Sequence, residues 1–426
     1  MALPFSPEFG LAAACAMWPP SDRRDEAICA AAAGPLDWPR LLRVAERHGV
    51  MGLVHDGLMR AQPNVPLKIA HEISAKAATL VRENLAVAVE AVRLQRLFEE
   101  ANLPVLFIKG ASLAALAFGN LSLRSGKDID LLVAYETLPA ATALILRAGY
   151  RRFDPPPDTS DAQLRLLMPL RKDLGFIHQA TGLPIELHWR LFLNPHAMAE
   201  VSFTASRLVP LTRTAGLRTL GEEDLFAYLC MHGALHWWNR LKWLADVNAL
   251  VAAAQEGDIE RLFRAAEVRG VGRAATLALL LCRRLLGTPL SAPLVATLGN
   301  RATVRWLGAT ALKAMTAGQG EHDPHDARFG INPRQRLDLS AQPELALSAG
   351  GTQHPSDQPD RRAGRAAAGL DAVPLPGPAA TALVVAPYRQ AQRGATDKKM
   401  STPVRRPCRS ARGKSPQDMR WNLILD

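Results

Sequence analysis

Apolar residues recur at helical spacing through the first hundred positions of the chain. Residues 38–48 show this spacing and are followed by Gly49, a residue type that commonly ends helices. A longer pattern of the same kind covers residues 67–100, and Pro104 lies shortly after its end. We therefore expect an N-terminal helical region over residues 1–100.

After residue 104 the pattern changes, and short apolar runs rich in β-forming residues alternate with short helical patterns. The runs that we expect to be strands are residues 105–108, 128–133, 174–178 and 184–189. Helical patterns at residues 111–118 and 138–148 separate the first three runs. Such alternation is typical of a small α/β or α+β sheet domain, and we expect the α+β class for residues 101–200.

The apolar spacing becomes helical again from residue 222 to residue 298. Residues 225–251 form one strongly amphipathic stretch, and residues 259–286 read as a pair of helices that is broken at Gly270. We expect a C-terminal helical region over residues 201–335.

In residues 336–426 the apolar positions follow neither the helical spacing of about 3.6 residues nor the strand spacing of about two. Proline, glycine, alanine, arginine and glutamine dominate there, so we expect a disordered segment, or one translated out of frame from a GC-rich gene. Of the net charge of +11, residues 331–426 supply a surplus of seven, with 15 Lys and Arg against 8 Asp and Glu, which leaves +4 for the first 330 residues. The basic tail could contact nucleic acid nonspecifically, but the nearly neutral body does not favour a dedicated nucleic-acid reader.

No targeting or membrane segment is expected. The apolar residues 11–17 follow no basic stretch, unlike a signal peptide. The longest later apolar run, residues 274–282, ends at Arg283 and is far shorter than the roughly 20 residues of a spanning helix. These features predict a soluble, cytoplasmic protein without a membrane span.

The most informative chemistry lies on the strand predicted at residues 128–133. Asp128 and Asp130 alternate with apolar residues, so the two carboxylates share one face of the strand while the other face can enter a core. Magnesium prefers oxygen ligands, and two ions about 3.5–4 Å apart can serve phosphoryl or nucleotidyl transfer. Taken alone, the pair also fits a solvated strand face.

A third carboxylate lies on a later predicted strand. Glu186 and His188 share one face of the segment Ile185-Glu186-Leu187-His188-Trp189, and the apolar residues occupy the other face. If this strand lies beside the one that carries Asp128 and Asp130, Glu186 joins their site. The alternative is an incidental acid on a half-exposed strand.

The turn after the first predicted strand could hold phosphate. Its sequence is Lys109-Gly110-Ala111-Ser112. A glycine at such a turn lets the backbone approach an anion, Ser112 offers a hydroxyl and Lys109 a positive charge. A Lys-Gly pair also occurs in many ordinary turns.

These motifs, taken in order, carry a family resemblance. They are the segment Phe107-Ile108-Lys109-Gly110, Arg124, residues 128–133 and residues 185–189, followed on the helical side by His232, His236, residues 240–244 and Asp246. The pattern resembles the uncharacterised bacterial nucleotidyltransferase family of the DNA polymerase β-type superfamily, over roughly residues 35–300. The resemblance implies a small mixed-sheet, polymerase β-like palm core flanked by the two helical regions.

The resemblance also implies roles for particular residues. Asp128, Asp130 and Glu186 would be the catalytic residues and would bind two Mg²⁺ ions. Lys109, Gly110, Ser112 and Arg124 would bind the phosphates of the nucleotide. In the superfamily Gly or Ser usually follows the glycine of the turn, whereas Ala111 stands here, and the distance along the chain to Asp128 is longer.

The implied activity is transfer of a nucleoside monophosphate from a nucleoside triphosphate to an acceptor, with release of pyrophosphate. The acceptor could be a protein, a sugar, a small molecule or an RNA end. One alternative is a nucleotide-binding or regulatory protein that has lost catalysis, which Ala111 favours. Another is a nucleic-acid-binding protein that acts through the basic tail.

The predicted C-terminal helices carry further polar residues. His232 and His236 are four positions apart on one helix face, which permits zinc binding but provides no third ligand; lining a cleft or forming buried hydrogen bonds is the simpler interpretation. Arg240 and Lys242 could contact phosphates or could be solvated helix charges.

Overall fold

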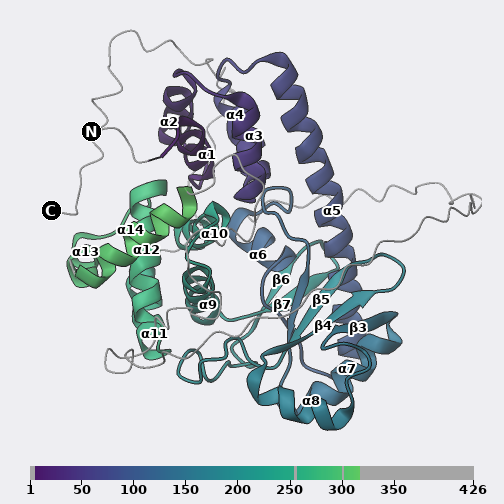
Figure 1. The fold of residues 1–426 in the computed structure, drawn as a ribbon. Coiled ribbons are helices and arrows are strands. Elements are labelled where there is room, and N and C mark those ends of the chain that lie inside the picture. The colour runs from purple at the N-terminus through teal and green to yellow at the C-terminus, as the bar shows by residue number, and fades with distance from the viewer. Residues whose placement is uncertain (1–4, 254–256, 300–301, 317–426) are drawn as a thin grey trace, which may run out of the picture. The chain divides into compact units, whose positions relative to one another are not determined.

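Helices precede the sheet in the computed structural model, which describes residues 5–253, 257–299 and 302–316 (Figure 1). They are α1 (Pro7–Ala16), α2 (Asp22–Ala32), α3 (Trp38–Arg47), α4 (Met51–Ala61) and α5 (Leu67–Glu100). Their positions confirm the helical pattern predicted for this part of the chain. The side chain of Asp37 accepts a hydrogen bond from the backbone of Arg40 and so caps the start of α3.

Helix α5 connects the N-terminal helices with the sheet, as Figure 1 shows. Val87, Ala91, Leu94 and Phe98 lie on one face of this helix, because they are spaced by three or four residues. All four belong to the apolar core that the sheet shares. Burial of this stripe attaches the second half of α5 to the sheet.

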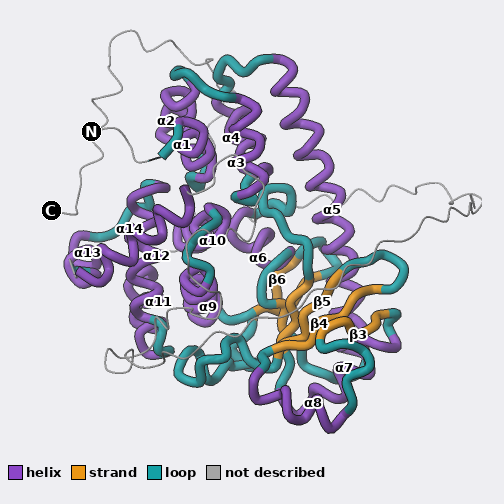
Figure 2. The backbone as a smooth tube through the Cα atoms, viewed as in Figure 1, coloured by secondary structure: helices purple, strands orange, loops and turns teal. Residues whose placement is uncertain are grey.

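The sheet has five strands in the order β1-β2-β5-β4-β3, coloured orange in Figure 2. They are β1 (Leu106–Phe107), β2 (Ile129–Leu132), β3 (Tyr150–Asp154), β4 (Asp173–His178) and β5 (Pro184–His188). The central strands β2 and β5 are parallel, and every other neighbouring pair is antiparallel. The sheet is therefore mixed, as the family resemblance implied.

One face of the central strands carries the core and the other carries the polar residues. Ile129 and Leu131 of β2 and Ile185 and Leu187 of β5 are buried in the core that includes α7 (Leu138–Arg147). The alternation predicted from the sequence is thereby confirmed. The opposite face of the same strands holds the carboxylates described below.

Several short elements have no counterpart in the sequence prediction. They are β3, α8 (Asp161–Leu167), η3 (Met168–Leu170), and the two-stranded ribbon of β6 (Arg207–Pro210) and β7 (Gly216–Thr219). In β3 the sequence Tyr-Arg-Arg-Phe-Asp has three charged residues out of five, so no apolar run marks it. The ribbon is fixed to the sheet by Thr219, whose hydroxyl donates to the carbonyl of Phe107 at 2.6 Å.

The remaining helices follow the ribbon. They are α9 (Glu222–Leu235), α10 (Leu241–Ala252), α11 (Asp258–Val268), α12 (Gly272–Leu286), α13 (Ala292–Leu298) and α14 (Ala302–Thr316). The stretch at residues 225–251 was predicted as one amphipathic unit, but it is two helices. Trp237 and Trp238 have φ angles of 57° and 54°, which end α9, and the indole of Trp238 is fully buried against Gly233.

The short helix predicted at residues 111–118 is present as α6 (Ala111–Leu113) followed directly by the π-helical turn η1 (Ala114–Phe118). The protein thus has the predicted α+β fold, in which helices come before and after a mixed sheet along the chain. Its division into domains ending near residues 100, 200 and 335 stays a prediction. The predicted tail, residues 336–426, lies outside the described residues.

Within the described part of the chain, no helix is both long and apolar enough to cross a membrane. The expected absence of a spanning helix is consistent with that finding, while the cytoplasmic location stays a prediction.

Candidate functional site

Two carboxylates face each other across the central strands of the sheet. Asp130 of β2 pairs in register with Glu186 of the parallel strand β5, so both side chains leave the sheet on the same face. Asp130 is 2% exposed, whereas Glu186 is 44% exposed. The site therefore has one buried carboxylate and one that solvent or a substrate can reach.

Asp128 lies two residues before Asp130, just ahead of β2, and its side chain is 36% exposed. Lys109 connects the two aspartates: its Nζ lies 2.8 Å from Asp130 Oδ2 and 3.3 Å from Asp128 Oδ2. The sequence predicted three carboxylates on one side of the sheet, and the register of β2 and β5 sets two of them, Asp130 and Glu186, side by side there. It did not reveal that a lysine would lie between two of them.

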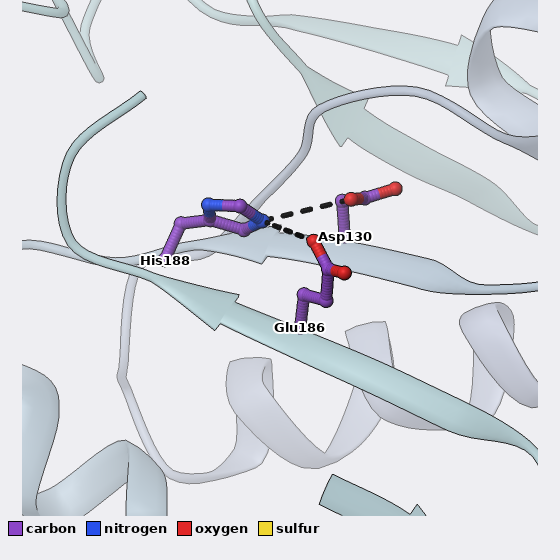
Figure 3. Close-up of side chains that lie close together, drawn as sticks. All are labelled: Asp130, Glu186 and His188. Carbon is purple, nitrogen blue, oxygen red and sulfur yellow. Dashed lines mark ion pairs between the residues drawn. The ribbon is translucent and has the colours of Figure 1, made fainter. Parts of the chain in front are cut away.

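His188 points toward Asp130 and Glu186, as Figure 3 shows. Its Nε2 lies 3.5 Å from Asp130 Oδ1 and 3.3 Å from Glu186 Oε2, and its Nδ1 lies 3.7 Å from Asp173 Oδ2 of β4. Both ring nitrogens thus face carboxylates, an arrangement that suits the doubly protonated imidazolium. The sequence placed His188 on the face of Glu186 but gave it no role.

The charges of this cluster reinforce one another. Burial disfavours the charged form of Asp130, but Lys109 and His188 outweigh it and lower the pKa of the carboxyl group. Burial likewise disfavours the ammonium of Lys109, yet Asp130 and Asp128 raise its pKa. The pKa of His188 is raised as well, because Asp130 and Glu186 outweigh the cost of burying the imidazolium. A buried carboxylate is thereby kept ionised.

The glycine turn predicted to hold phosphate lies beside the aspartates. Gly110 has a φ of 82°, which side-chain-bearing residues rarely adopt, and a Cβ added to it would lie 3.9 Å from the carbonyl oxygen of Asp128. Ser112 is fully buried, and its hydroxyl lies 3.3 Å from the carbonyl oxygens of both Phe107 and Lys109. This hydroxyl fixes the shape of the turn.

Arg124 is held by a residue of the C-terminal helices. Its Nε lies 2.9 Å from Asp246 Oδ1 and its Nη2 lies 3.0 Å from Asp246 Oδ2, a two-pronged ion pair in which both side chains are buried. The Nη1 atom of Arg124 faces Gly126, where an added Cβ would lie 3.7 Å from it and 3.8 Å from the Cα atom of Gly110. The guanidinium thus borders the glycine turn.

The histidines of the helical side are stacked with aromatic rings. The ring centroids of His232 and His236 are 4.7 Å apart, and His236 stacks on Trp243 at 4.9 Å. Tyr228 stacks on His232 at 5.5 Å. The described residues bring no third metal ligand to this pair of histidines, and the group of possible metal ligands among them is Asp130, Glu186 and His188 of the sheet.

The sequence of the chain matches a known protein family. The sequence profile of a family described as uncharacterised nucleotidyltransferases matches residues 34–287, more than half of the chain. The chain belongs to this nucleotidyltransferase family. The match begins just before α3 and ends after α12, so it includes every predicted site residue of the chain. No curated protein matches the sequence.

The side chains of the candidate site fit a divalent cation. One ligand atom each from Asp130, Glu186 and His188 lies within 4.8 Å of the others. Asp130 Oδ2 is buried and lies 2.8 Å from Lys109 Nζ, so a bound cation would share this carboxylate with the lysine. A buried oxygen of this kind, next to a second carboxylate, suits a hard cation such as Mg²⁺. Asp128, which was also predicted as a ligand, lies on the Lys109 side of the group.

Proposed function

We propose that this protein is an Mg²⁺-dependent nucleotidyltransferase that transfers a nucleoside monophosphate from a nucleoside triphosphate to an acceptor and releases pyrophosphate. The observation that supports the proposal most directly is the register of β2 and β5, which sets Asp130 opposite Glu186 with Asp128 two residues away. Membership of a nucleotidyltransferase family supports the general type of reaction.

In this proposal Asp128, Asp130 and Glu186 hold the cation, and His188 holds the two carboxylates of Asp130 and Glu186 in place. When bound, Mg²⁺ neutralises phosphate oxygens and so lowers the barrier to substitution at phosphorus. The residues Lys109, Gly110, Ser112 and Arg124 would form the phosphate site, with Ser112 acting through the shape of the turn.

The acceptor oxygen forms a bond to the α-phosphorus, while the bond from that phosphorus to the bridging oxygen breaks and pyrophosphate leaves. The proton of the acceptor hydroxyl goes to the Glu186 carboxylate, which is exposed enough to meet an acceptor from solvent. Catalysis of this kind depends mainly on position and charge.

The test compares the full chain with an Asp128→Asn/Asp130→Asn variant. Thermal stability is measured with each nucleoside triphosphate, with and without Mg²⁺, together with pyrophosphate release. We expect one nucleotide to raise the melting temperature in the presence of Mg²⁺, since a ligand at a hundred times its Kd stabilises by about 2.7 kcal/mol. The variant should lose both this rise and pyrophosphate release.

A matched control is Asp158→Asn/Asp161→Asn, which removes two exposed carboxylates near the start of α8. It should behave like the wild type. Undiminished pyrophosphate release by a cooperatively melting Asp128→Asn/Asp130→Asn variant would refute the proposed function.

One observation favours a second candidate, a nucleotide-binding protein without turnover. The ammonium of Lys109 lies between Asp128 and Asp130, so a cation of the protein itself already pairs with both carboxylates. A nucleotide that raises the melting temperature without any release of pyrophosphate would support this candidate. The alternative of nucleic-acid binding through the tail concerns residues outside the described part of the chain.

A further inference from the structure

The positive charges around the glycine turn are mostly neutralised by carboxylates. Lys109 pairs with Asp128 and Asp130, and Arg124 pairs with Asp246. These pairs leave little free positive charge for a bound anion. A triphosphate carries several negative charges, so a cation that is not already paired would strengthen a phosphate site.

Lys242 of α10 is such a cation. Its side chain is half-buried, and its Nζ donates to the carbonyl oxygen of Ser125 at 3.4 Å. Among the described residues, no carboxylate lies within ion-pairing distance of this ammonium. A half-buried charge with a neutral partner is poorly compensated, and an anionic ligand would compensate it.

The position of Lys242 relative to the phosphate turn follows from the loop between Arg124 and Asp128. Ser125, which accepts the hydrogen bond from Lys242, precedes Gly126. Gly126 packs against the Gly110 turn, since an added Cβ would lie 3.8 Å from the Gly110 Cα atom. Lys242 therefore reaches, from the helical side, the loop that borders the glycine turn.

The N-terminal helices hold Lys242 in this position. The backbone amide of Leu241 donates to His48 Nδ1 at 3.0 Å, and the amide of Lys242 donates to the carbonyl oxygen of His48 at 3.1 Å. The next residue, Gly49, has a φ of 66°, and a Cβ added there would lie 2.7 Å from Lys242 Cδ. The end of α3 thus caps α10 and leaves space for the lysine stem.

We propose that Lys242 binds the triphosphate chain of the nucleotide donor, and that the phosphate site is formed jointly by the Gly110 turn and the start of α10. This inference rests on the proposed function, and it assigns a binding role to a residue outside the sheet. The ligand chemistry is a polyphosphate, whether free or attached to a nucleoside.

The charges around Lys242 make this role detectable by pH. The groups that face it from the packed elements are Lys109, Arg124, Asp128, Asp246, His232 of α9 and His48 of α3. Burial, together with Arg124, lowers the pKa of Lys242 to about 8. The pKa of His48 is lowered to about 3 and that of His232 well below its usual value, so neither histidine titrates near pH 8.

A phosphate bound to Lys242 stabilises the ammonium and raises its pKa. Binding above pH 8 therefore takes up a proton, and the affinity for a polyphosphate falls as the pH rises from about 8. Below pH 8 the lysine is protonated in both states and contributes no pH dependence. An arginine at this position would keep its charge throughout.

The experiment measures binding of inorganic tripolyphosphate to the full chain by calorimetry without divalent cations, at pH 7.5 and 9.5. The variants are Lys242→Met, Lys242→Arg and the control Lys313→Met, which removes an exposed lysine of α14. We expect Lys242→Met to weaken binding at pH 7.5 by roughly ten- to a hundredfold, the usual effect of a charged hydrogen bond. Lys242→Arg should retain binding and lose the decline at pH 9.5, and Lys313→Met should match the wild type.

Equal affinities of Lys242→Met and Lys313→Met at pH 7.5 would overturn the inference, as would a wild type that binds no tripolyphosphate. Melting curves of each variant separate lost binding from lost folding, and Lys242→Arg keeps the test decisive if Lys242→Met does not fold. Lys242-dependent binding in a protein that releases no pyrophosphate from any nucleotide supports the inference and rejects the proposed function. Pyrophosphate release by Lys242→Met with an unchanged KM for the nucleotide supports the proposed function and rejects the inference.

Discussion

Replacing Asp246 by asparagine should destabilise the protein strongly, because it removes one charge of a buried pair. Arg124 and Asp246 are 5% and 2% exposed, and they share two charge-assisted hydrogen bonds of 2.9 and 3.0 Å. Asparagine has nearly the same shape as aspartate but carries no charge. The guanidinium of Arg124 then stays in the interior without a counter-charge.

The size of the effect follows from this burial. Removing one partner of a buried pair typically costs about 3–5 kcal/mol, and asparagine retains one acceptor, so we expect about 3 kcal/mol. The unfolding entropy grows with chain length, so for a protein of this size each kcal/mol shifts the melting temperature by about 1.5 °C, which gives a decrease of about 5 °C. An Arg124→Met/Asp246→Leu variant, which removes both charges, should recover much of this loss.

The assay is thermal or urea unfolding of Asp246→Asn, and of Arg124→Met, Asp246→Leu and their double variant, the last three being analysed with the wild type as a double-mutant cycle. The matched control is the exposed pair of Arg261 and Glu222, at 2.8 Å and 43% and 36% exposed, where Glu222→Gln should cost less than about 1 kcal/mol. Additive effects of the two single changes at Arg124 and Asp246 would show that the pair does not act as a unit. The reasoning would then be wrong.

Three further predictions concern the phosphate site. Gly110→Ala forces a φ of 82° on an alanine, which costs about 1–2 kcal/mol and should weaken nucleotide binding in the same thermal-shift assay; unchanged binding would show that the turn does not hold phosphate. Gly49→Ala should reduce tripolyphosphate affinity as Lys242→Met does, because the new Cβ displaces the lysine stem, and calorimetry would contradict this if affinity stayed at the wild-type value. The pKa of Lys242 is about 8 when folded and 10.5 in its ordinary state, so the unfolded chain binds more protons between these values. The free energy of unfolding should therefore rise with pH across this window, by at most about 3 kcal/mol, relative to Lys242→Met; parallel pH profiles of the two proteins would exclude the effect.

The sequence was sufficient to predict the carboxylates because their signal is local. Asp128, Asp130 and Glu186 alternate with apolar residues that the core requires, so the face of each strand was determined by its own sequence. The pairing of β2 with β5 was a condition in that argument, since strands distant in the chain carry no mark of their neighbours. The structure supplied the register that sets Asp130 against Glu186.

Other features depend on contacts between distant segments and could not be predicted in the same way. Arg124 and Asp246 are 122 residues apart, and nothing in the sequence around either residue indicates that the two form an ion pair. The break after α9 arises because Trp238 folds back onto Gly233, whereas the apolar spacing of residues 225–251 continues through it. The strand β3 was missed because three of its five residues are charged and Tyr150 is its only fully buried side chain.

The cap that His48 places on α10 has a consequence for how this protein could be divided. Every carboxylate of the candidate site lies after α5, so a catalytic fragment cut at that point would retain all of them. Such a fragment would nevertheless lose the imidazole and carbonyl that hold the first turn of α10, and with them the orientation of Lys242. A fragment that keeps the orientation of Lys242 therefore has to begin before α3, which is also where the match to the family begins.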